Sequence, residues 1–174
     1  NVSGYTPSEW TGDCDADGNV SLAEGDNKTC YIINDDIAPT LNLVKEVPNN
    51  DGGTAVAGDW ELTADGAQNS FTDFGDSTTF HTVTAGVAYS LSESDVPGYT
   101  AGDWSCDGGS LVEGEVTLGL DEEVTCTITN DDIAPQLKLV KEVEGGNSVA
   151  GDWTLTASGE EGFSDSGDSD SFHE

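Results

Sequence analysis

The feature that most constrains the fold of this chain is an internal repeat. The phrase IINDDIAPTLNLVKEV at residues 32–47 returns at residues 128–143 as ITNDDIAPQLKLVKEV, with three differences. Within these phrases, Asn34 and Asn130 are 96 residues apart. A period of this length is typical of small domains arranged in tandem, because a domain of roughly 100 residues can bury its own hydrophobic core.

The repeat divides the chain into three parts. Residues 1–37 correspond to the C-terminal part of one repeat, residues 38–133 to a complete repeat, and residues 134–174 to the N-terminal part of the next. We expect the chain to be a window onto a longer array. The alternative is that neighbouring subunits, placed head to tail, complete the two partial repeats.

The charge of the chain excludes two classes of partner. With 35 acidic residues and four basic ones the net charge is −31, so nucleic acids and anionic membrane surfaces would be repelled. No stretch approaches the ~20 apolar residues of a membrane-spanning helix, and we expect no direct membrane insertion. The acidic residues alternate with regularly spaced apolar ones, which argues against a disordered acidic tail.

The four cysteines form two pairs at equivalent positions of the repeat, namely Cys14 with Cys30 and Cys106 with Cys126. Each pair brackets a turn rich in Gly and Asp between two strand-like segments, and no metal-binding Cys/His spacing is present. The pattern predicts one disulfide per repeat and therefore an oxidising, extracellular location.

Short segments rich in Val, Ile, Thr and Tyr alternate between turn residues, and no long segment has helical periodicity. The pattern predicts an all-β fold of tandem antiparallel β-sandwich repeats, immunoglobulin-like in type, with about seven short strands in each. The strands expected in the complete repeat lie near residues 41–47, 60–65, 78–84, 87–93, 99–106, 115–119 and 123–130.

Three of these strands direct one polar residue into the predicted core. Side chains alternate between the two faces of a strand, so Lys45 shares a face with leucines of the first strand. By the same rule Glu93 follows Tyr89 and Leu91 on its strand, and Asn130 ends the apolar face of the last strand. An isolated buried polar group is costly, so the three side chains are expected to meet.

An amine, a carboxyl group and a carboxamide in an apolar environment form a reactive set. Burial favours the neutral, nucleophilic form of the Lys45 amine and the neutral form of Glu93. Glu93 would hydrogen-bond to the side-chain carbonyl of Asn130 and transfer protons while ammonia leaves. The expected product is an amide (isopeptide) bond between Lys45 and Asn130, with Glu93 as the catalytic carboxyl group.

Non-covalent alternatives stay open at this point. Lys45 could extend its ammonium group to the edge of the sandwich and form an ion pair with Glu93. Asn130 begins a turn-favouring NDD cluster, so its side chain could only cap the linker that follows and take no part in a bond with Lys45. A third alternative is a cluster in which Lys45, Glu93 and Asn130 contact one another without a covalent bond.

The segments LVKEV, YSLSE followed by VPGYT, and TCTITNDD resemble the SpaA-like (Cna protein B-type, prealbumin-like) repeats of bacterial surface proteins. The resemblance covers the full repeat and implies β-sandwiches that build stalks, adhesins and pili. It also implies an intramolecular Lys–Asn bond assisted by an acidic residue. Many members that have this bond lack the Cys126 pairing, and a disulfide could replace the bond here.

The resemblance implies an extracellular structural protein, a stalk or pilus-like filament. Its partners would be further copies of itself, assembled head to tail or laterally, or other surface proteins. In the partial repeats, Asn34 and Lys141 are the equivalents of the crosslinking residues and could meet if copies polymerise. No Ser/His/Asp grouping is present, so we expect no enzyme beyond the self-modification and no cofactor other than calcium.

Calcium binding is suggested by one acidic segment, DCDADGNVSLAE at residues 13–24, which matches a calcium-loop pattern. An ordinary acidic hairpin is the competing interpretation, because no helices flank the segment and the equivalent loop of the complete repeat lacks the pattern. A calcium-dependent cell-surface adhesion module is therefore the alternative function. The predicted ligands are Asp13, Asp15, Asp17, Asn19, Ser21 and Glu24.

Overall fold

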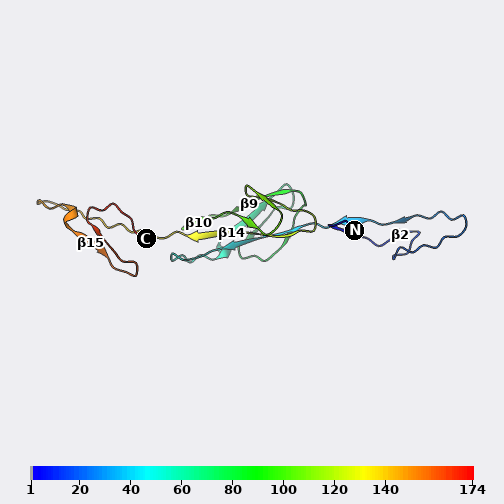
Figure 1. Cartoon of the computed structure of the whole chain (residues 1–174), viewed down its shortest axis with the longest axis horizontal. Helices are drawn as coiled ribbons and strands as arrows, with labels where there is room; N and C mark the ends of the chain where they lie inside the picture. Colours follow the sequence, from blue (N-terminus) through cyan, green and yellow to red (C-terminus); the bar gives the residue numbers. More distant parts are fainter. Residues whose placement is uncertain (1) are drawn as a thin grey trace.

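The alternating segments between residues 40 and 132 pair into two five-stranded sheets that face each other. A computed structural model describes residues 2–174, and the sandwich occupies the middle of an elongated molecule (Figure 1). One sheet has the order β10-β14-β5-β8, with β11 also paired to β14, and the other has the order β12-β13-β9-β6-β7. The strands are β5 (Thr40–Glu46), β6 (Glu61–Asp65), β7 (Phe71–Phe74), β8 (His81–Thr82), β9 (Ala88–Glu93), β10 (Tyr99–Ala101), β11 (Ser105–Cys106), β12 (Ser110–Val112), β13 (Glu115–Thr117) and β14 (Glu123–Asp132).

The first and last strands of the sandwich, β5 and β14, are neighbours and run parallel. Their register extends from Glu123 opposite Thr40 to Thr129 opposite Glu46, and it places Lys45 opposite Ile128. Every other named strand pair among the described residues is antiparallel. The chain therefore enters the sandwich beside the strand by which it leaves.

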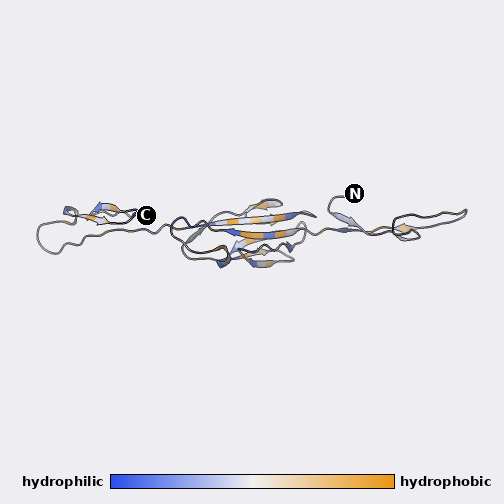
Figure 2. Ribbon diagram, turned by 90° about the horizontal axis from the view of Figure 1, so that it is seen from below, coloured by the Kyte–Doolittle hydropathy of each residue, from blue (hydrophilic) through white to orange (hydrophobic). Residues whose placement is uncertain are grey.

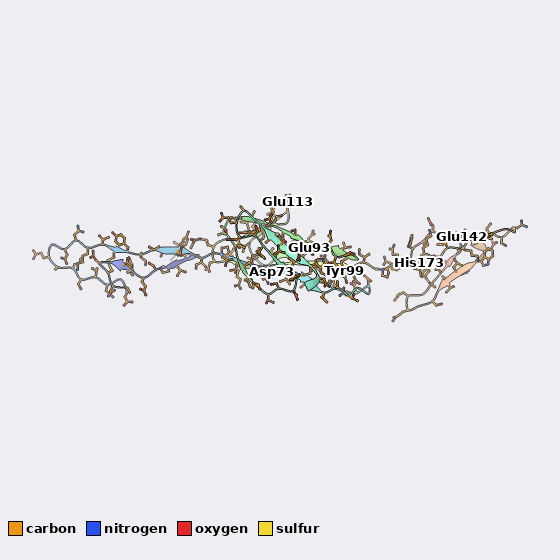
Figure 3. All side chains as sticks on the ribbon, turned by 180° about the vertical axis from the view of Figure 1, so that it is seen from behind. Asp73, Glu93, Tyr99, Glu113, Glu142 and His173 are labelled. Atoms are coloured by element: carbon orange, nitrogen blue, oxygen red, sulfur yellow. A yellow bond between two sulfur atoms is a disulfide. The ribbon has the colours of Figure 1, made fainter. Side chains whose placement is uncertain are left out.

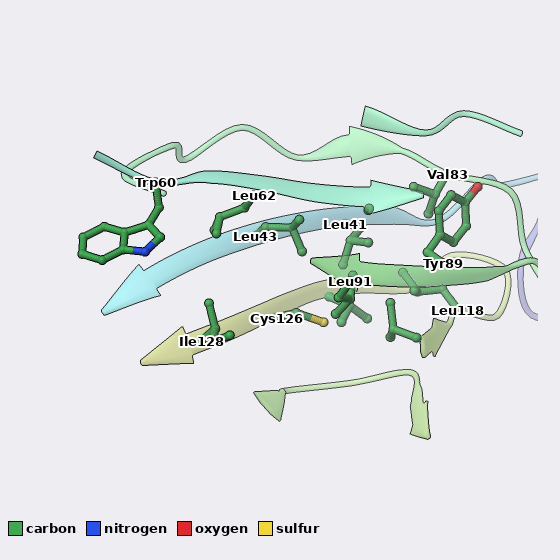
Figure 4. Packing of buried hydrophobic residues seen from close by; sticks show 13 residues of the cluster. Leu41, Leu43, Trp60, Leu62, Val83, Tyr89, Leu91, Leu118, Cys126 and Ile128 are labelled. Carbon is green, nitrogen blue, oxygen red and sulfur yellow. The ribbon is translucent and has the colours of Figure 1, made fainter. Parts of the chain in front are cut away.

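The core lies between the two sheets and is formed by the inward faces of their strands (Figure 4). Period-two alternation accounts for most of its composition, because alternate residues of β5, β9 and β14 are buried, with Glu93 half-buried at the end of β9. Asn42 of β5 is buried outside this alternation. Figure 2 shows the resulting alternation of apolar and polar residues along the central strands. The buried apolar residues are Leu41, Leu43, Trp60, Leu62, Ala64, Val83, Tyr89, Leu91, Val116, Leu118, Val124, Cys126 and Ile128.

Small two-stranded sheets lie on either side of the sandwich. On the N-terminal side these are β1 (Tyr5–Pro7) with β4 (Asn34–Asp36), and β2 (Thr11–Gly12) with β3 (Cys30–Tyr31). On the C-terminal side β15 (Thr154–Ala157) pairs with β16 (Phe163–Ser166).

The helices of the described chain are two short 3-10 turns, η1 (Ala57–Asp59) and η2 (Ala150–Asp152). Within residues 2–174, no helix has the length and apolar character needed to cross a membrane.

The pairing on the two sides of the sandwich repeats pairing inside it. Tyr5 lies opposite Asp36 as Tyr99 lies opposite Asp132. Leu137 forms an isolated bridge with His173, which corresponds to the pairing of Leu41 with His81. The repeat seen in the sequence is therefore also a repeat of local structure. The boundaries at residues 37 and 133 stay predictions.

The predicted all-β sandwich is confirmed, whereas several predicted strand limits differ. The expected strand at 99–106 is divided into β10 and β11, and the expected strand at 78–84 contracts to β8. Strands β7 and β12 were not predicted. Both are edge strands that pair on one side only, and their half-exposed sequences, FTDF and SLV, lack a continuous apolar face.

At the end of β14, Asp132 fixes the loop that follows β5. Its carboxylate accepts backbone N–H groups of Asn50 at 2.9 Å, Asp51 at 2.9 Å and Gly53 at 2.6 Å. Burial raises the pKa of Asp132, but these donors favour the charged form more strongly, so its pKa lies below the ordinary value. The side chain of Asp132 is almost fully buried, whereas that of the equivalent Asp36 is exposed.

Replacement of Asp132 by alanine should release this loop. We expect faster hydrogen exchange at the amides of Asn50, Asp51 and Gly53, because their common acceptor is lost. The Asp36→Ala variant is the matched control and should leave these amides unchanged. Since the folded-state pKa is lowered, the anchor is complete above the ordinary aspartate pKa and is lost as the pH falls through the lowered value. Unchanged exchange in Asp132→Ala would contradict this assignment.

Candidate functional site

The lysine of β5 is enclosed in the sandwich instead of reaching its edge. The side chain of Lys45 is 0% exposed, and its Nζ lies 4.8 Å from the centre of the Trp60 ring. Its backbone N–H donates to the carbonyl of Gly75 at 2.8 Å. A β-carbon on Gly75 would lie 2.4 Å from the Lys45 β-carbon, so only glycine leaves room for the lysine stem here.

A single carboxylate contacts both of the other polar groups. Glu93, at the end of β9, forms an ion pair with the Lys45 Nζ through its Oε2. Its Oε1 accepts a hydrogen bond from the Asn130 Nδ2 at 2.8 Å. Figure 3 shows Glu93 within the central sandwich. The structure thus brings Lys45, Glu93 and Asn130 together from three different strands.

The hydrogen bond of Asn130 differs in one respect from the sequence expectation. The expected contact joined Glu93 to the side-chain carbonyl of Asn130, whereas the structure joins it to the amide nitrogen. The Asn130 Oδ1 is buried without a hydrogen-bond partner. The carboxamide therefore presents its nitrogen to the carboxylate and keeps an unsatisfied carbonyl in an apolar environment, which is a costly arrangement.

The electrostatic environment of Lys45 favours loss of its proton. Burial lowers the pKa of the Lys45 amine below its ordinary value, although the hydrogen bond and charge of Glu93 act in the opposite direction. A neutral amine is nucleophilic and an ammonium ion is not. The arrangement can therefore support attack of the amine on the carboxamide.

The equivalent residues outside the sandwich, Asn34 and Lys141, lie in separate parts of the molecule. Asn34 is exposed at the start of β4, where it lies opposite Pro7. Lys141 lies on the C-terminal side of the sandwich with its Nζ 5.0 Å from the centre of the Trp153 ring. The structure reproduces the lysine–tryptophan contact at Lys141 but does not bring Asn34 to it.

Both predicted disulfides are present, Cys14 with Cys30 and Cys106 with Cys126, and the described chain has no free cysteine. The second disulfide links β11 to β14, the strand that positions Asn130. The disulfide pairing is therefore confirmed, and its position on the Asn130 strand does not displace Asn130 from Glu93.

The acidic segment at residues 13–24 forms an exposed turn held by its own carboxylates. Asp13 accepts the N–H of Thr29 at 2.7 Å, and Asp15 accepts the N–H of Asn19 at 2.7 Å. The bond from the Asn19 backbone is the main cause of the lowered pKa of Asp15. Across residues 2–174 no three acidic, His or Cys side chains converge as a metal site would require. Calcium binding by Asp13, Asp15, Asp17, Asn19, Ser21 and Glu24 stays a prediction.

Sequence reasoning did not assign Trp60 and Gly75 to the site. The only sequence signal at either position is recurrence, of Trp60 as Trp153 and of Gly75 as Gly167. Gly167 approaches Lys141 as Gly75 approaches Lys45, since its added β-carbon would lie 2.8 Å from the Lys141 β-carbon. Comparison of the two repeats around each lysine would have identified both residues.

The two histidines repeat one contact. His81 is 2.5 Å from Asp73 through its Nε2 and stacks on Phe71. His173 makes the same contacts with Asp165 and Phe163. In each case the histidine links its strand or bridge segment to the facing hairpin.

Comparison with known proteins gives one family and one related structure. A family model described as a prealbumin-like fold domain, of the SpaA type, matches residues 36–128 and 132–174. Among solved structures, the chain is similar to the major pilin protein (T3.2) from Streptococcus pyogenes serotype GAS13637, with 15% identity and a TM-score of 0.41. The match covers 76% of this chain and 64% of that pilin. No functionally curated protein matches the sequence.

Because the family model covers most of the chain, the assignment does not depend on the distant structural match. The matched residues include the whole of β5 and β9 and most of β14, the three strands that position the lysine, the glutamate and the asparagine. The chain belongs to the family of SpaA-type prealbumin-like fold domains.

Proposed function

We propose that this chain is part of an extracellular structural protein, a stalk or pilus-like fibre, whose central sandwich is locked by an isopeptide bond between Lys45 and Asn130. The observation that supports it best is the buried cluster in which Glu93 contacts both the amine and the carboxamide. Membership of the SpaA-type family and the elongated shape agree with a mechanical role (Figure 1). Further copies of the chain or other surface proteins are the proposed partners.

The reaction requires only the three side chains. The Glu93 Oε2 takes a proton from the Lys45 ammonium group, and the neutral amine attacks the side-chain carbonyl carbon of Asn130. A new C–N bond forms, and the bond from that carbon to the Asn130 Nδ2 breaks. Glu93 passes this proton through its Oε1 to the leaving nitrogen, which departs as ammonia. The new amide nitrogen then gives up its second proton through Glu93 to the ammonia, which becomes ammonium. The products are an amide linking the two side chains and ammonium, and Glu93 returns to its carboxylate form.

The position of the proposed bond would allow it to carry tension applied to the ends of the chain. The chain enters the sandwich through β5 and leaves through β14, and these two strands are parallel neighbours. Tension applied at the two ends would therefore shear the β5–β14 hydrogen bonds. A covalent link between Lys45 and Asn130 would transmit the tension directly from β5 to the end of β14. Residues 46–129, which include the Cys106–Cys126 disulfide, would then not be loaded.

The mass of the intact chain tests the crosslink. Under reducing conditions, we expect a deficit of one ammonia relative to the sequence mass, located by peptide fragmentation to Lys45 and Asn130. Glu93→Gln should retain the ammonia, because the isosteric amide cannot accept the lysine proton. Asn34→Ala is the matched control and should keep the deficit, since Asn34 is the repeat equivalent outside the cluster. A folded wild-type chain with the full mass would refute the bond.

Extension of single molecules tests the mechanical role. With the chain held at its ends under reducing conditions, the wild type should lack the lengthening that comes from residues 46–129. At about 3.4 Å for each extended residue, this is roughly 290 Å. Glu93→Gln should show the additional extension, because no covalent link shields these residues. Equal extension of the two proteins would mean that the load does not pass through a bond at Lys45.

A further inference from the structure

The linker between the N-terminal sheets and the sandwich is hydrogen-bonded on both sides. The N–H of Ile37 donates to the carbonyl of Gly4 at 2.8 Å. Gly4 lies just before β1. The carbonyl of the same Ile37 accepts a hydrogen bond from the N–H of Asp121 at 2.9 Å. Asp121 belongs to the loop between β13 and β14. One linker residue thus joins the preceding segment to the sandwich.

The next linker residues are fixed to the sandwich alone. The carbonyl of Pro39 accepts the N–H of Val83 at 2.9 Å, and the N–H of Thr40 donates to the carbonyl of Glu122 at 2.8 Å. Pro39 is fully buried. These bonds fix the chain to the sandwich from the carbonyl of Ile37 onward, so the only free backbone torsions between the two anchored parts are those of Ile37 itself.

A side-chain contact closes the same joint. Gly4 is buried against Leu120, and a β-carbon placed on Gly4 would lie 2.6 Å from the Leu120 β-carbon and 3.4 Å from its Cδ1. Contacts as short as 2.6 Å between carbon atoms are sterically forbidden. Only glycine at position 4 therefore allows the loop around Leu120 to approach this closely.

The second linker supplies an internal comparison. Ile133 donates its N–H to the carbonyl of Gly98 at 2.9 Å, as Ile37 does to Gly4, and the φ angles of the two glycines are alike, +88° and +82°. Yet Gly98 is exposed with no atom within 4 Å of its added β-carbon, and Ile133 is 59% exposed. The glycine turn therefore forms without a neighbour, whereas its burial at Gly4 requires the Leu120 loop.

From these contacts we propose that Leu120 and Asp121, in the loop between β13 and β14, form a docking surface for the end of the preceding segment. The partner that fits this surface is the glycine turn before β1 together with Ile37 of the NDDIAP linker. Docking fixes the direction in which one segment follows the other, so the joint is stiff. The alignment of the N-terminal sheets with the long axis of the sandwich agrees with this arrangement (Figures 1 and 2). The proposal does not depend on the Lys45–Asn130 bond.

Residual dipolar couplings of backbone amides in the full chain test the proposal. We expect the amides of β1–β4 and those of β5–β14 to fit one alignment tensor of equal magnitude in the wild type, as in a rigid body. Gly4→Ala should separate the two tensors, because the new methyl group clashes with Leu120. Gly98→Ala is the matched control: it places the same residue at the same positive φ without a neighbour, and should leave the single tensor unchanged.

Leu120→Asp disturbs the contact from the opposite side and should also separate the tensors, with the sandwich shown to be folded by its own amide shifts. Two independent tensors in the wild type would overturn the proposal. A single tensor retained in both Gly4→Ala and Leu120→Asp would overturn it as well, since the contact would then not determine the orientation.

Discussion

The parallel pairing of β5 with β14 organises the sandwich and its buried polar cluster. It places the strand that enters the sandwich beside the strand that leaves it, with Lys45 opposite Ile128. The inward faces of both strands belong to one core, so Lys45 and Asn130 must share that core. Two polar groups in this position need a partner, and Glu93 on the facing sheet contacts both.

The same pairing separates the roles of the two covalent links. The disulfide between Cys106 and Cys126 holds β11 to β14 and stabilises the sandwich by restricting the unfolded chain. Both cysteines lie in sequence between Lys45 and Asn130. With the proposed isopeptide bond in place, tension along the chain would pass from β5 to the end of β14 without reaching the disulfide. The disulfide would then stabilise the fold, and the isopeptide bond would carry the tension.

Most of the candidate site could be predicted from the sequence, because alternation along a strand is a local property. The inward direction of Lys45, Glu93 and Asn130 follows from residues two positions away on the same strand. The cysteine pairs could be predicted because both members recur at equivalent positions. The predicted contact between Glu93 and the Asn130 carbonyl was wrong in detail, since the orientation of a carboxamide depends on neighbours from other strands.

Other features had no local signal. Trp60 and Gly75 enclose the Lys45 side chain, but neither residue type is characteristic of a reactive lysine. The edge strands β7 and β12 were missed because pairing on one side does not require a continuous apolar face. The calcium-loop pattern also gave no sign that its carboxylates stabilise the turn by accepting hydrogen bonds from backbone N–H groups.

The repeat, the all-β class, the inward residues and the cysteine pairs could be predicted from the residues alone. These properties depend on neighbours in the chain or on the repeat. Three features are visible only in the folded chain: the first and last strands are parallel neighbours, Glu93 contacts both Lys45 and Asn130, and Leu120 packs on Gly4. The physical reason is that these contacts join residues far apart in the chain, and their geometry depends on sheet order and packing.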